Sequence, residues 1–297
     1  MPFGLVNASG SFSRLMRKLL EGMQCVDNFI DDVIIYTSSF QQHLVVIEEF
    51  LQRLRAANLT VKPSKCFIGY SSLECLGHIA GCEQLRPLPD KVTAISNFVR
   101  PSSKKQVRSF LGLVGFYRRF IPNFSAIAAP LSDLTKKGQP NKVAWKEPQE
   151  NAFIALRSAL MVTPVLKLPN LNDTFILQTD ASDVGVGAVL LQYEDGVKKP
   201  VAYASKKLNK AQVNYSTIEK ECFAIIWAIQ KFCRFLYGKE FLLETDHQPL
   251  VYLTNAKVSN ARLMRWALLL QPFRFRIVSI KGSENVGVDC LSRLCYA

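Results

Sequence analysis

The stretch Leu177-Gln178-Thr179-Asp180-Ala181-Ser182 decides the fold of the last third of the chain. Its apolar start and polar end predict a half-buried strand that finishes at one edge of a sheet, with Asp180 at that edge. Gly185 and Gly187 follow, and glycine allows the close backbone approach that is needed where a hairpin turns back. The stretch therefore predicts a carboxylate that projects from the end of a central strand.

Apolar spacings on both sides of this stretch predict the rest of a domain. The expected strands are 174–180, 185–192, 199–204, 240–246 and 273–280, and the expected helices are 214–236, 248–254, 259–270 and a short last helix that carries Asp289. Their order, β-β-β-α-β-α-α-β-α, is typical of an α/β layer with a mixed sheet.

Three further acids stand at corresponding places, within a helix at Glu221, at a strand end at Asp246, and at a helix start at Asp289. Carboxylates that converge repel one another unless cations lie between them, and a cluster of hard oxygen ligands suits Mg²⁺. Two such ions can split a phosphodiester. The alternative for each acid is an ordinary turn, cap or helix-surface residue.

Glu219 competes with Glu221 for the inward position on the long helix. Residues two apart cannot share a helix face. Glu221 is spaced with Ile218 and Ile225 on the more apolar side. We therefore expect Glu221 to point inward as a ligand, and Glu219 to be solvated.

The earlier part of the chain predicts a different mixture of elements, of the α+β kind. Expected are helices at 11–23 and 40–57, a hairpin over Val26–Tyr36, short strands at Thr60–Val61, Cys66–Ile68 and Leu73–Leu76, helices after Pro89, from Ser102-Ser103 to Phe120 and from Pro148 to Leu160, and a linker at 136–146. Three domains are predicted, at 1–86, 87–163 and 164–297.

The composition favours a polyanionic partner inside the cell. The 37 basic and 24 acidic residues give a net charge of +13, which favours phosphate contacts, although a basic surface without a ligand is the alternative. The eight cysteines form no Cys-x-x-Cys pair and the three histidines are scattered, so neither disulfides nor zinc are expected and a reducing compartment fits. Neither a secretory signal nor a membrane-length apolar run is visible, so an intracellular, cytoplasmic protein without a membrane partner is expected.

Four motifs near these acids resemble the ribonuclease H domain of gypsy-type LTR retrotransposon polyproteins. They are Thr179-Asp180-Ala181-Ser182, Tyr215–Glu221, Thr245-Asp246-His247-Gln248-Pro249-Leu250 and Val288-Asp289-Cys290-Leu291-Ser292-Arg293. The resemblance implies that Asp180, Glu221 and Asp246 bind two Mg²⁺ ions, for which Mn²⁺ substitutes, and that Asp289 completes the site. It also implies cleavage of the RNA strand in an RNA–DNA hybrid.

The rest of the chain resembles the reverse transcriptase of the same family. Met1-Pro2-Phe3-Gly4-Leu5-Val6-Asn7-Ala8 is similar to the segment beside the incoming nucleotide, Phe29-Ile30-Asp31-Asp32 to the paired-aspartate turn of the palm, Leu76-Gly77-His78 to the hairpin at the primer end, and Phe110–Pro122 to the helical segment that follows. The resemblance implies that Asp31 and Asp32 bind metal and act in catalysis. It also implies nucleic-acid contacts by Phe3, Gly4, Asn7, Phe29, Gly77, His78, Arg118 and Arg119.

Two alternatives without a role in catalysis or binding stay open for these motifs. Asp31 and Asp32 also suit a solvated hairpin turn. The cations Lys104, Lys105, Arg108, Arg118 and Arg119 also suit a solvated helix face, although interleaved aromatic residues favour phosphate contacts.

The resemblance predicts a partial palm, a helical thumb or connection and a ribonuclease H-like mixed-sheet domain. RNA template, DNA primer and RNA–DNA hybrid are the implied partners, with virus-like particles as a location and a dimer through adjacent Pol regions as an option. The family has a further metal-binding aspartate upstream of its Met-Pro-Phe-Gly segment. We therefore expect polymerase activity in the full-length parent and little in this chain, and the alternative reading is a non-catalytic hybrid-binding remnant of a decayed element.

Overall fold

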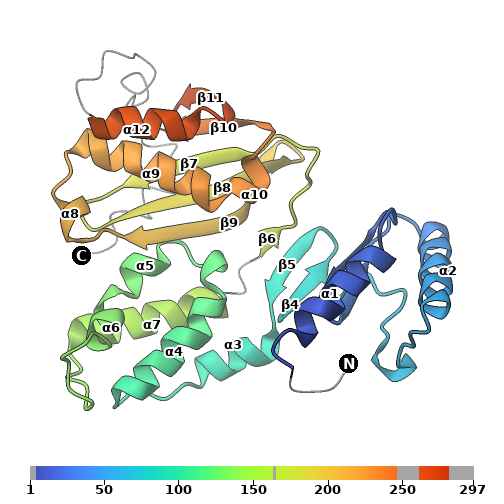
Figure 1. Ribbon diagram of the computed structural model, residues 1–297. Coiled ribbons are helices and arrows are strands. Elements are labelled where there is room, and N and C mark those ends of the chain that lie inside the picture. The colour runs from blue at the N-terminus through green and yellow to red at the C-terminus, as the bar shows by residue number, and fades with distance from the viewer. Residues whose placement is uncertain (1–4, 163–164, 246–260, 281–297) are drawn as a thin grey trace. The chain divides into compact units, whose positions relative to one another are not determined.

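The computed structural model describes residues 5–162, 165–245 and 261–280. The chain divides into two units, Met1–Leu73 and Glu74–Ala297 (Figure 1). The three domains predicted at 1–86, 87–163 and 164–297 stay a prediction. Among the described residues, no helix combines the length and the apolar character needed to cross a membrane.

The first unit contains two helices and the predicted hairpin. Its elements are α1 (Ala8–Leu19), β1 (Val26–Phe29), β2 (Asp32–Ile35), α2 (Phe40–Ala56) and the 3₁₀ turn η1 (Pro63–Lys65). β1 and β2 are antiparallel, with Phe29 opposite Asp32. Met16 of α1 and Phe50 and Leu54 of α2 are buried in one apolar cluster, as the helical spacing predicts. Leu15, Leu44 and Leu51, which the same spacing puts on the apolar faces, are exposed.

The short strands predicted at Thr60–Val61 and Cys66–Ile68 are wrong. Pro63 begins a 3₁₀ turn between them, and proline has no N–H to donate to a strand ladder. Phe67 and Ile68 are exposed. Local β-propensity without a neighbouring strand therefore did not produce a strand here.

The second unit begins with a small sheet and a group of helices. Its first elements are β3 (Ser72–Cys75, which crosses the boundary between the units), β4 (His78–Gly81), β5 (Gln84–Pro87), α3 (Pro89–Ser96), α4 (Lys104–Phe116), η2 (Arg118–Phe120), α5 (Phe124–Ile127), α6 (Ala129–Leu134), α7 (Glu147–Met161) and β6 (Leu166–Lys167). β4, β5 and β6 pair antiparallel in that order.

A capping box starts α4 where the sequence predicts it. The Ser103 hydroxyl accepts the backbone N–H of Gln106, and the Gln106 side chain accepts the backbone N–H of Ser103. The helix was predicted to reach Phe120, but it ends at Phe116 and continues as the η2 turn. Pro122 fits the end of η2, because the residue before proline is disfavoured in the helical conformation and Ile121 is extended.

The mixed sheet predicted for the last part of the chain is confirmed. Its strands are β7 (Ile176–Ala181), β8 (Gly185–Glu194), β9 (Val197–Lys207), β10 (Glu240–Thr245) and β11 (Arg274–Ser279), in the spatial order β11-β10-β7-β8-β9. β7, β8 and β9 are antiparallel, whereas β10 lies parallel to both β7 and β11.

The long helix predicted at 214–236 is two helices, α9 (Thr217–Lys231) and α10 (Cys233–Leu236), and a short helix that was not predicted, α8 (Lys210–Val213), precedes them. Ser216 caps α9 and so separates it from α8. α9 and α12 (Ala261–Leu270) cover one face of the sheet (Figure 1). The helix predicted at 248–254 and the last helix with Asp289 lie outside the described residues.

Candidate functional site

Asp180 lies in β7, one position before the end of that strand. The side chain is 7% exposed. Ile176 and Leu177 bury the start of the same strand completely, which fixes its position in the sheet. Gly187 of β8 lies directly opposite Asp180, so the neighbouring strand places no side chain beside the carboxylate.

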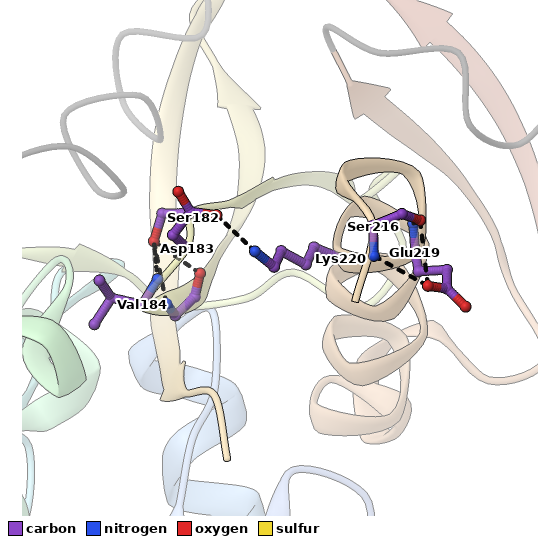
Figure 2. Close-up of polar contacts among 7 residues, drawn as sticks. Ser182, Asp183, Val184, Ser216, Glu219 and Lys220 are labelled. Atoms are coloured by element: carbon purple, nitrogen blue, oxygen red, sulfur yellow. Dashed lines mark hydrogen bonds and ion pairs between the residues drawn. The ribbon is translucent and has the colours of Figure 1, made fainter. Parts of the chain in front are cut away.

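Glu221 points inward from α9, as the sequence predicts. It is 4% exposed, and α9 packs against β7. The capping box of α9 fixes the start of this helix, because Ser216 Oγ accepts the backbone N–H of Glu219 at 3.3 Å and the Ser216 N–H donates to Glu219 Oε2 at 3.0 Å (Figure 2).

Two details of the predicted helix face are wrong. Ile218, expected to point inward with Glu221, is exposed. Glu219, expected to be solvated, is mostly buried and pairs with Arg262 of α12 at 2.8 Å. The error at Glu219 has a clear cause: α12 packs beside α9 and offers the Arg262 cation to the side of the helix that sequence spacing assigned to solvent.

An ion pair joins the turn after β7 to the start of α9. Lys220 Nζ lies 2.6 Å from Asp183 Oδ1 (Figure 2), and this hydrogen bond and charge hold the pKa of the Asp183 carboxyl below its usual value. Asp183 follows Asp180 in the chain, and Lys220 directly precedes Glu221. The end of β7 with Asp180 and the helix turn with Glu221 are therefore neighbours.

The other two predicted ligands, Asp246 and Asp289, lie outside the described residues. β10 runs parallel beside β7 with Glu244 opposite Gln178, and Asp246 follows that strand in sequence. Within the described ranges, no group of three or more His, Cys, Asp or Glu side chains gathers as a metal site. The structure thus places two of the four predicted acids near one another.

The pKa of the Cys222 thiol reflects the burial and the charges beside Glu221. Burial raises the pKa of the Cys222 thiol to about 12, and the charges of Glu221 and Glu219 add to the shift. The thiol stays protonated at neutral pH and is no nucleophile. The negative charges of Glu221 and Glu219 beside this position favour a cation.

The paired aspartates of the first unit lie on the predicted hairpin. Asp31 is exposed in the turn, and Asp32 is the exposed first residue of β2. Phe29, opposite Asp32, is 55% exposed. Asn7 is exposed at the start of α1, whereas Phe3 and Gly4 lie outside the described residues. The metal and nucleic-acid roles of these residues stay predictions.

Gly77 and His78 are packed against the helical segment. The Tyr117 hydroxyl donates to the Gly77 carbonyl at 2.9 Å. The His78 ring stacks between Phe116 and Phe120, with centroid distances of 5.1 and 5.6 Å. Burial lowers the pKa of His78, so its imidazole is neutral at physiological pH. These contacts give His78 a packing role, and its predicted contact with nucleic acid stays a prediction.

Replacing Gly77 by alanine tests this packing. Gly77 has φ +78°, and an added Cβ would lie 2.9 Å from Phe116 Cζ. Gly138 is the matched control, because it has φ +89° but open space around its Cα. We expect Gly138→Ala to cost about 1–2 kcal/mol of unfolding free energy from backbone strain, and Gly77→Ala to cost roughly 1 kcal/mol more from the clash. Urea unfolding measures both; equal losses would contradict the packing.

The predicted cationic surface has partners within the chain. Arg118 Nη2 lies 3.4 Å from the Ser205 carbonyl, and burial lowers the pKa of Arg119. Lys104 Nζ donates to the Lys136 carbonyl at 2.6 Å, and Arg108 donates to the Thr135 carbonyl at 3.2 Å. These side chains hold loops and join elements, and their contacts with phosphate stay predictions.

Sequence reasoning missed Asp183, Lys220 and the role of Ser182. A lysine in the first turns of a helix, directly before a buried acid, is a signal that could have been read, because helix starts disfavour cations. The pairing with Asp183 depends on the approach of α9 to the turn after β7 and has no signature in the spacing.

Comparisons with known proteins agree with this geometry. A family model described as "RNase H-like domain found in reverse transcriptase" matches residues 170–273, and one described as "Reverse transcriptase (RNA-dependent DNA polymerase)" matches residues 1–80. The chain is 40% identical to the retrovirus-related Pol polyprotein from transposon 297 of Drosophila melanogaster, over 99% of this chain and 28% of that protein. It is 38% identical to the Pol polyprotein from transposon gypsy of the same fly, over 99% and 29%.

A yeast relative and solved structures extend the likeness. The Tf2-3 transposon polyprotein of Schizosaccharomyces pombe is 35% identical over 99% of this chain and 22% of that protein. The foamy viral protease-reverse transcriptase in complex with RNA/DNA hybrid has a similar fold, with a TM-score of 0.81 and 23% identity over 95% of this chain and 39% of that chain. The chain spans less than a third of the length of these curated relatives. It belongs to the gypsy-type retrotransposon Pol polyproteins and carries a reverse transcriptase segment followed by an RNase H-like domain.

Proposed function

We propose that residues 164–297 cleave the RNA strand of RNA–DNA hybrids with the help of divalent cations. The observation that carries the proposal is the burial of two carboxylates, Asp180 and Glu221, on a strand and a helix joined at one place by the Lys220–Asp183 ion pair. Asp246 and Asp289 are the proposed further ligands. The RNase H-like family match over residues 170–273 supports this reading.

The chemistry of the donors fits Mg²⁺, with Mn²⁺ as a substitute. Carboxylate oxygens are the hard ligands that these ions prefer. Two neighbouring buried carboxylates disfavour each other's ionised form unless a cation compensates them. When bound, a pair of divalent ions supplies the charge that makes water nucleophilic and stabilises the oxygen that leaves.

The side chains of this protein supply the framework of the site. The antiparallel ladder to β8 fixes Asp180, and the capping box of α9 fixes the helix that carries Glu221. The fold thus holds Asp180 and Glu221 in buried positions before substrate arrives, and such preorganisation lowers the cost of reorganisation during the reaction.

The substrate class follows from charge and from the relatives. The net charge of +13 favours a polyanion, and similar solved proteins are reverse transcriptases in complex with double-stranded DNA or with RNA/DNA hybrid. Accessible 2′-hydroxyls on an A-form-like duplex would mark the RNA strand for cleavage. RNA template and DNA primer are the partners that we propose for the reverse transcriptase segment within the longer protein.

The compartment that we propose is the cytoplasm, including virus-like particles. Cys25, Cys66 and Cys233 are free thiols in the described part of the chain, which supports this proposal because free thiols persist in a reducing compartment.

Incubation with an RNA–DNA hybrid whose RNA strand carries a 5′ label tests the function. We expect cleavage of the RNA in the presence of Mg²⁺ or Mn²⁺, and no cleavage with EDTA. Single-stranded RNA and double-stranded DNA of the same sequence are the controls and should stay intact. Tight binding of the hybrid without metal-dependent cleavage would instead support the non-catalytic binding protein.

A further inference from the structure

Lys220 occupies an unusual place for a lysine. It is the fourth residue of α9, which begins at Thr217, and its side chain is only 11% exposed. Unpaired N–H groups give a helix start a partial positive charge that disfavours cations. Burial of an ammonium group adds a desolvation cost. A lysine at this position therefore requires a compensating partner.

The partner is Asp183, at 2.6 Å, but this carboxylate is 92% exposed. An ion pair with so exposed a member adds little to the stability of a fold, because water competes for it and salt screens it. The net gain in folding free energy is therefore small, and the structural effect of the contact is to join the start of α9 to the turn after β7.

The turn that carries Asp183 is itself rigid. Ser182 Oγ accepts the N–H groups of Val184 and Gly185 at 3.3 and 3.1 Å. The Ser182 backbone N–H donates to the Gly185 carbonyl at 2.8 Å. Figure 2 shows Lys220 reaching from α9 to this turn. A shift of Lys220 relative to the turn would therefore also be a shift relative to β7 and Asp180.

The start of α9 is also held on a second side. Arg262 pairs with Glu219 at 2.8 Å, and its guanidinium lies 4.2 Å from the centroid of the Tyr215 ring. This contact holds the helix start to α12. Lys220 holds the same helix turn to the segment that follows Asp180. The two contacts together hold the helix turn next to Glu221 to α12 and to the turn after β7.

We propose that Lys220 is a positioning residue for the divalent cations of the nuclease site. Its ion pair with Asp183 keeps the Asp180 and Glu221 carboxylates at the spacing that the cations require. The proposal rests on the proposed function of these two acids as metal ligands. Residues that orient ligands in this way affect metal affinity without touching the metal.

Mn²⁺ titration of the protein without nucleic acid, followed by the electron paramagnetic resonance of free Mn²⁺, tests the proposal. The Mn²⁺ binding that is lost in Asp180→Asn defines the site. We expect Lys220→Met to weaken that binding by about tenfold, and the Mg²⁺ concentration for half-maximal hybrid cleavage to rise by a similar factor. Lys220→Arg, which keeps the charge, should stay near the wild type. Lys231→Met, an exposed lysine at the end of the same helix, is the matched control.

Asp183→Asn keeps the test decisive if Lys220→Met does not fold, because Asp183 is on the surface. It should weaken Mn²⁺ binding in the same direction, and the exchanged pair Lys220→Asp with Asp183→Lys should recover part of the loss. Unchanged Mn²⁺ affinity in both Lys220→Met and Asp183→Asn would overturn the proposal, as would a higher KM for hybrid with unchanged Mn²⁺ affinity.

The proposed nuclease function and the positioning role of Lys220 can be refuted independently of each other. If the wild type does not cleave hybrid but Lys220→Met still loses Mn²⁺ affinity, the nuclease function is wrong and the positioning role stands. If the wild type cleaves in a manner that depends on Asp180 and Lys220→Met binds Mn²⁺ normally, the positioning role alone is wrong.

Discussion

Asp180→Asn is expected to lower hybrid cleavage by about a thousandfold or more, since a ligand change at a catalytic metal site removes several kcal/mol of transition-state stabilisation. The asparagine keeps the shape of the side chain and removes its charge. The residue is buried in a paired strand, so the amide can fit without moving the backbone. Glu221→Gln should have an effect of the same order.

Single-turnover cleavage of labelled hybrid at saturating Mg²⁺ measures this loss. Asp195→Asn is the matched control, because Asp195 is exposed in the turn between β8 and β9 with φ 49°, a conformation that asparagine tolerates. It should cleave like the wild type. Wild-type cleavage by Asp180→Asn would show that Asp180 is no ligand.

Lys198→Met is expected to destabilise the RNase H-like domain by about 2–3 kcal/mol, because it leaves a buried carboxylate without its cation. Glu244 is 5% exposed and lies 2.7 Å from Lys198 Nζ, which is 34% exposed. Lys198 also donates to Glu244 Oε2 at 2.8 Å. Gln178 donates to the same oxygen at 2.6 Å, so the carboxylate would keep one neutral partner. The partial exposure of Lys198 keeps the loss below that of a fully buried pair.

Denaturant unfolding of three variants separates the charge from the packing. Glu244→Leu combined with Lys198→Met removes both charges and should be less destabilised than Lys198→Met alone. Lys199→Met, at the exposed neighbouring position, should be neutral. If the double variant were the least stable of the three, the loss would come from packing rather than from an uncompensated charge.

The strands of the five-stranded sheet in the RNase H-like domain followed from local patterns. Apolar runs ended by Gly, Asp or Ser predicted β7, β8 and β9 to within a few residues, because each of these strands pairs with a strand close to it in sequence. Ser103 was predicted as a helix cap for the same reason, since its bonds lie within four residues. Local chemistry was sufficient for these elements.

The wrong predictions concern residues whose burial or pairing depends on a segment that is distant in the sequence. Glu219 was predicted to be solvated. This is wrong because Arg262 approaches it from another helix. The strand predicted at Cys66–Ile68 has β-prone residues but no partner strand among the described residues. Asp180 and Glu221 were predicted from their types and places. The contact between Lys220 and Asp183 requires the packing of α9 against the sheet, which no spacing encodes.

The central claim is that Asp180 and Glu221 hold divalent cations together. Anomalous diffraction from crystals soaked in Mn²⁺ tests it most directly. We expect Mn²⁺ peaks at coordination distance from both carboxylates, and we expect these peaks to be lost in Asp180→Asn. Well-ordered carboxylates of both residues without a Mn²⁺ peak between them would contradict it.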